Sequence, residues 1–166
     1  MRVVDEKQND GAKVSFYKVI QETLSMIRNH DDLRYKRVYK EISLIEHTDL
    51  PGIGAYKRGR KVCSVDLENL PALDNEEYVR VVLACTLIHE ATHGKICSFF
   101  IPYTRSDRAR IEGICNRESN AFLSKLDIVW AKDMRSSTDE NDLKVTSSFS
   151  YKLEKLKDVA KKIMKE

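Results

Sequence analysis

The sequence contains few of the residues that interrupt regular structure or cross-link a small fold. It has 3 prolines and 6 glycines among 166 residues, which favours long helices and strands over a loop-rich fold. Its 4 cysteines show no CxxC spacing, and the first residues, MRVVDEKQND, lack the apolar stretch of a secretory signal. No run approaches the roughly 20 apolar residues of a membrane span. We therefore expect a soluble, cytoplasmic protein with reduced thiols and no membrane span.

A strong excess of either charge is also missing. The 29 basic residues are nearly balanced by 26 acidic ones, and both are spread along the chain. This balance argues against a nucleic-acid partner. The local basic cluster Lys57, Arg58, Arg60 and Lys61 is interpreted as a solvated turn, with contact to an acidic partner or a phosphate as the alternative.

The hydrophobic pattern predicts an α+β fold in one domain, residues 1–166. Strands are expected over 35–47, 54–57 and 61–67, the last two joined as a hairpin, in a small antiparallel sheet of about three strands. Helices are expected over 13–30, from Asp74 to a terminating Gly94, from about 106 to 133, and, amphipathic and packed on the domain, within 143–166.

The helix predicted from Asp74 is apolar almost all round and should be buried against the sheet. Asp74 with Glu77 three residues later matches a capping box. The end of this helix reads His-Glu-Ala-Thr-His over residues 89–93. Burying two histidines and a glutamate at the end of an apolar helix costs free energy unless they bind a common partner. Their presence here therefore favours a functional site.

This HExxH motif is typical of a zinc site. Residues four apart share one helix face, so the imidazoles of His89 and His93 can reach one ion. Glu90 points about 100° away around the helix and is suited to activate water rather than to bind the ion. The opposing interpretation is that both histidines are ordinary core or surface residues and the motif is accidental.

A catalytic zinc site needs a third protein ligand, and no histidine follows the motif. Glu112 and Glu118, both on the next predicted helix, remain open as that ligand. Glu112 lies on a polar stripe that continues through Asn116, whose side chain could accept a hydrogen bond from a ligand histidine. Glu118 falls on the apolar stripe, or could pair with a nearby arginine. We favour Glu112.

Cysteine offers a further possibility at the same place. Cys97 and Cys115 flank the expected zinc elements, and either could act as a fourth ligand. That would give a closed structural site instead of an open catalytic one. Glu90 beside the first histidine argues for the open site, because a structural site has no use for a general base.

The stretch LIHEATH, residues 87–93, followed by Arg110-Ile111-Glu112, resembles the gluzincin metallopeptidases, the group that includes thermolysin. It is closer to small bacterial proteins that carry HEATH than to thermolysin itself. Position 116 is Asn where that group often has an acid, so the neighbour of the third ligand is neutral here. The resemblance covers residues 87 to about 122.

The resemblance implies a zincin-like minimal core with two zinc-site helices and a sheet whose edge strand binds an extended peptide. We expect the strand 61–67 to be that edge, because it directly precedes the motif helix. Such enzymes stabilise the oxyanion with a tyrosine, histidine or arginine, and Tyr103 or Arg105 could serve. Tyr103 as simple packing is the competing interpretation.

The sequence thus predicts a zinc-dependent peptidase acting on a peptide or protein. His89, His93 and Glu112 would bind Zn²⁺, and Glu90 would act as general base. The alternative is a zinc-binding regulatory or partner-sensing module with little or no turnover.

Overall fold

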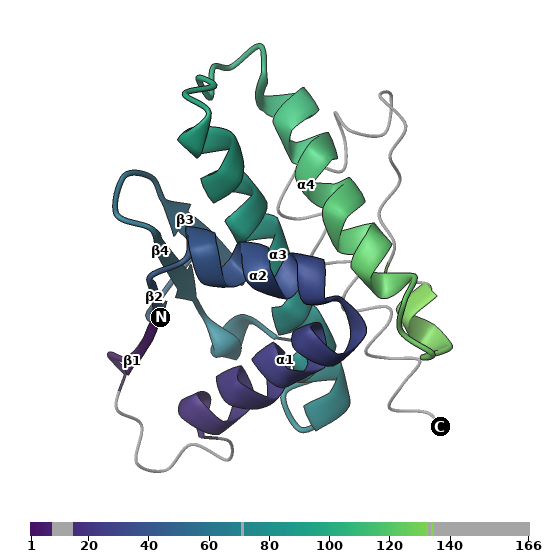
Figure 1. Cartoon of the computed structure of the whole chain (residues 1–166). Helices are drawn as coiled ribbons and strands as arrows, with labels where there is room; N and C mark the ends of the chain where they lie inside the picture. Colours follow the sequence, from purple (N-terminus) through teal and green to yellow (C-terminus); the bar gives the residue numbers. More distant parts are fainter. Residues whose placement is uncertain (8–14, 71, 133, 135–166) are drawn as a thin grey trace.

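A computed structural model of the chain describes residues 1–7, 15–70, 72–132 and 134 (Figure 1). The helices are α1 (Phe16–His30), α2 (Asp32–Glu41), α3 (Glu76–Ser98) and α4 (Arg108–Leu123). The strands are β1 (Arg2–Asp5), β2 (Leu44–His47), β3 (Gly54–Lys57) and β4 (Val62–Val65). The prediction of an α+β fold is confirmed. The amphipathic helix expected within 143–166 lies outside the described residues.

The sheet differs from the expected small antiparallel one. Its four strands are ordered β1-β2-β4-β3, and β1 with β2 and β2 with β4 pair in parallel. Only the hairpin strands β3 and β4 are antiparallel, as predicted from their turn. Parallel neighbours need a crossover, and α1 and α2 supply it between β1 and β2.

The strand predicted over 35–47 is in fact a helix followed by a strand. Asp31 accepts a hydrogen bond from the backbone N–H of Arg34 at 3.2 Å and so caps the N-terminus of α2. Val38 of α2 and Ile42, just after it, are fully buried, while Lys36 and Lys40 face solvent. The β-branched residues Val38 and Ile42 do not distinguish a strand from a helix here, because their spacing of four residues also suits a helix.

Helix α3 runs through the centre of the molecule, with α1 and α2 crossing one side and the sheet against another (Figure 1). Its N-cap is Asn75, not Asp74, because the Asn75 side chain accepts from the Tyr78 N–H at 2.9 Å. Gly94 does not end the helix, which continues to Ser98. A Cβ at Gly94 would lie 2.8 Å from Tyr56 Oη and 3.0 Å from Glu41 Cβ. Glycine is needed here for close packing of α2 and β3 on α3.

Helix α4 is shorter than the predicted 106–133 and lies along α3, where the Ser119 hydroxyl donates to the Cys85 carbonyl at 3.1 Å. The strand β4, predicted as the peptide-binding edge, lies inside the sheet between β2 and β3. That prediction is wrong, since proximity in sequence to α3 does not set the order of strands. The edge beside α3 is β3. No helix in the described part of the chain has the length and apolar character needed to cross a bilayer.

Candidate metal centre

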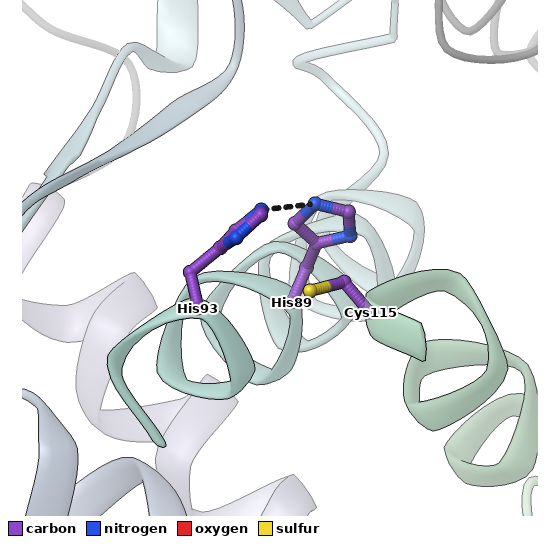
Figure 2. A group of neighbouring side chains, drawn as sticks. All are labelled: His89, His93 and Cys115. Atoms are coloured by element: carbon purple, nitrogen blue, oxygen red, sulfur yellow. Dashed lines mark hydrogen bonds between the residues drawn. The ribbon is translucent and has the colours of Figure 1, made fainter. Parts of the chain in front are cut away.

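Two imidazoles meet on one side of α3. His89 and His93 are four residues apart on the helix, and both rings project in the same direction, tips together (Figure 2). Their Nε2 atoms lie 3.2 Å apart, and the ring planes are inclined by 63°. Both side chains are nearly buried, with exposed fractions of 13% and 11%. The regular geometry of the buried helix is sufficient to produce this pair.

Glu112 on α4 faces the pair. Its Oε2 lies 3.2 Å from His89 Nε2, and its Oε1 lies 3.4 Å from His93 Nε2. Burial alone would raise the pKa of this carboxyl, but the two histidines and a hydrogen bond from Tyr103 outweigh burial and hold the pKa well below its usual range. The carboxylate is therefore ionised and aimed at both imidazoles, as expected for the favoured third residue.

Tyr103 supports Glu112 from the connection between α3 and α4. Its hydroxyl donates to Glu112 Oε1 at 2.6 Å, and its ring meets the His93 ring edge-on with centroids 5.7 Å apart. Burial, together with the negative charge of Glu112, raises the pKa of Tyr103 to about 12. Arg105, the other residue considered for the oxyanion, is exposed and makes no hydrogen bond or ion pair within the described ranges.

Glu118 has different neighbours. Its Oε2 lies 2.9 Å from Arg34 Nη2 and 2.7 Å from Arg37 Nη1, and both arginines come from α2. Arg34 also donates its Nε–H to the backbone carbonyl of Glu118 at 2.9 Å. The structure thus separates the two glutamates that the sequence left open: Glu112 lies with the histidines and Glu118 lies with the arginines.

Glu90 faces the sheet rather than α4. It is buried, with an exposed fraction of 8%, and it forms no hydrogen bond or ion pair with the residues that the structure describes. The edge strand β3 lies against α3 here, since a Cβ at Gly54 would overlap Thr86 Cγ2 and lie 3.7 Å from Glu90 Oε1. The carboxylate therefore lies beside the edge strand β3.

Cys115 completes the surroundings of the histidines. Its Sγ and one ring nitrogen each of His89 and His93 lie within 4.8 Å of one another, so this group could hold a metal ion. Figure 2 shows the sulfur entering from α4, near the base of His89. The other candidate, Cys97, does not belong to this group. Asn116 is buried, and within the described ranges its Nδ2 lacks a hydrogen-bond partner and neither histidine bonds to it.

One contact was missed from the sequence. The guanidinium of Arg58, at the β3–β4 turn, lies 4.2 Å from the centre of the Tyr103 ring. The sequence predicts a solvated turn here, and nothing in the local pattern indicates that it reaches the connection after α3.

A search of protein-family models, of curated proteins and of solved structures returned no match to this chain.

Proposed function

We propose that the chain is a zinc-dependent peptidase in which His89, His93 and Glu112 bind the ion and Glu90 is the general base. The supporting observation is the spacing of the donor atoms, which are separated by 3.2, 3.2 and 3.4 Å. Tetrahedral ligands at Zn²⁺ bond lengths of 2.0–2.1 Å are about 3.3 Å apart. Two imidazoles and one carboxylate are also the donor set of several catalytic zinc sites.

Each residue then has a distinct task. When bound, Zn²⁺ would supply Lewis-acid chemistry, which polarises a carbonyl and makes water more acidic. Glu90 takes the proton of the attacking water and passes it to the leaving amine. The free edge of β3, which lies against α3 at Thr86 and Glu90, gives an extended peptide a place to pair beside the base.

The zinc-binding module without turnover remains the second candidate, and Cys115 is the observation that favours it. A thiolate joining the two histidines and Glu112 would fill the fourth position and leave no room for water. Zn–S bonds of about 2.3 Å place a sulfur about 3.5 Å from its fellow ligands. The atoms of the group with Cys115 lie within 4.8 Å of one another, whereas those of the two histidines and Glu112 lie within 3.4 Å, so the open site is the better fit.

Metal content and a single substitution test the proposal. Purified protein is expected to bind one Zn²⁺ per chain, measured by mass spectrometry of the native protein. Glu90→Gln should keep the metal and lower peptide hydrolysis by about 100-fold or more, because only proton transfer is removed. If the unmodified protein does not bind one Zn²⁺ per chain, the proposed metal site is contradicted. Unchanged turnover in Glu90→Gln would contradict the role of the base.

Cobalt substitution separates the open site from the closed one. The proposal predicts a Co²⁺ spectrum without the near-ultraviolet band of a thiolate ligand, and the same spectrum for Cys115→Ser. A thiolate band that Cys115→Ser abolishes would establish the closed site and favour the binding module instead.

A further inference from the structure

The turn between β3 and β4 carries four cations with unequal surroundings. Lys57 forms an ion pair with Glu46, and Lys61 donates to the Lys40 carbonyl at 3.0 Å. Arg58 is exposed, and no carboxylate in the described part of the chain pairs with it. Its described contact is with the neutral face of the Tyr103 ring, at 4.2 Å. Arg58 is therefore a positive charge held in place without a counter-charge.

The place where Arg58 is held is the candidate metal centre. Tyr103, under the guanidinium, donates to Glu112, and its ring touches that of His93. Arg58 thus lies one aromatic ring away from two of the proposed ligands. Arg108, in the first turn of α4, also lies near the Tyr103 hydroxyl, where its positive charge works to lower the pKa of Tyr103. Arg58 and Arg108 thus place two positive charges near this tyrosine.

A guanidinium in contact with a ring keeps its N–H groups available. Contact with an aromatic face uses the charge and the flat surface of arginine, while its five donors lie in the guanidinium plane and match a carboxylate in two-point geometry. Neighbouring Cα atoms of a peptide are about 3.8 Å apart. The Tyr103 ring separates Arg58 from the proposed ligands. A carboxylate one or two residues away from a carbonyl at the metal can therefore span this ring and reach the guanidinium of Arg58.

We propose that Arg58 is a specificity residue that binds a carboxylate of the substrate, next to the bond that is cleaved. The inference rests on the proposed peptidase function, because it places the carboxylate relative to a carbonyl at the metal. The carboxylate can be an acidic side chain or a free C-terminus, which share this chemistry. The site selects against peptides that are neutral at this position, since they leave Arg58 without a partner.

Binding of small hydroxamates to the zinc-loaded protein tests this without turnover. The probes are succinic monohydroxamate and its primary amide, which have the same shape but differ by one negative charge. Isothermal titration should show the carboxylate binding about tenfold more tightly than the amide, the usual value of one charged hydrogen-bonded contact. Arg58→Gln should remove that ratio and leave the amide affinity unchanged, and Arg58→Lys should retain part of it.

Arg60→Gln is the matched control, because it removes the same charge from the same exposed turn. It should retain the tenfold ratio. Equal binding of both probes by the unmodified protein, or a ratio that survives Arg58→Gln, would overturn the inference and leave the metal centre intact. Failure of both probes to bind would overturn the open metal centre and the inference with it.

Two longer probes distinguish the source of the carboxylate. In one, the succinyl hydroxamate is extended by glycine with a free C-terminus. In the other, it is extended by glutamic acid amidated at its C-terminus. The probe whose affinity falls about tenfold in Arg58→Gln identifies which carboxylate the arginine receives. If neither affinity depends on Arg58, the inference is overturned.

Discussion

Glu112 and Glu118 lie on one helix, yet their environments differ at the scale of single atoms. Glu112 is shared by two imidazoles and a phenol, whereas Glu118 receives two guanidinium groups from α2. A carboxylate that is ion-paired with two arginines already has its charge compensated, so it is poorly suited to bind a metal. The same side chain thus serves different purposes at two positions of α4.

Matched substitutions of these glutamates give the residue-scale prediction. Glu112→Gln is expected to lower zinc affinity by at least about tenfold, because an amide is a weaker ligand than a carboxylate. Glu118→Gln should leave zinc affinity unchanged and lower the free energy of unfolding by about 2 kcal/mol, since two arginines lose their partner. Competition titration with a chelator measures the affinity, and urea unfolding measures the stability. The reverse pattern would assign the ligand to Glu118.

At the scale of elements, the junction between α1 and α2 is held by one buried carboxylate. Asp31 is 2% exposed and caps α2, and it also pairs with Arg34 and, at 2.9 Å, with Lys125 beyond α4. Burial works to raise the pKa of Asp31, but Lys125 and Arg34 outweigh burial and lower the pKa below its ordinary value. This side chain therefore joins α1, α2 and the segment that follows α4.

The sign of that pKa shift sets the dependence of stability on pH. A carboxyl whose pKa is lowered by folding stabilises the protein fully above its unfolded pKa, about 4, and loses this contribution as pH falls through the folded value. Asp31→Asn keeps a capping oxygen but loses the charge, and should lower the free energy of unfolding at pH 7 by about 2 kcal/mol. The difference from the unmodified protein should shrink towards pH 3. A difference that stays constant from pH 7 to pH 3 would contradict this account.

At the scale of the whole molecule, the candidate metal centre joins α3 to α4 near their shared connection (Figure 1). Zinc that binds this assembled site but not the unfolded chain stabilises the fold by mass action. Free Zn²⁺ at 100 times its Kd should add about 2.7 kcal/mol, which raises Tm by about 5–10 °C in a domain of this size.

His93→Ala should abolish this increase, and EDTA should reverse it in the unmodified protein. Thermal unfolding followed by circular dichroism measures both. An equal increase in His93→Ala would mean that zinc stabilises the protein at another place.

Local spacing alone was sufficient for some features. The convergence of His89 and His93 follows from four residues of helix, and the β3–β4 hairpin follows from its turn residues. The helix after residue 74 was predicted from its apolar run, although its cap is one residue later and its end four residues later than Gly94. These features depend only on neighbours along the chain.

The tertiary structure decided the rest, because those features depend on residues that are distant in sequence. The pairing of β2 with β1 and β4 sets the sheet order, and it left β3 rather than β4 at the edge. The orientation of α4 about its own axis places Glu112 beside the histidines. Glu118 forms ion pairs with the arginines of α2 instead. The need for glycine at position 94 and the position of Arg58 likewise depend on contacts with other elements. Periodicity assigns a face to each element, but which faces meet is settled only when the whole core is packed.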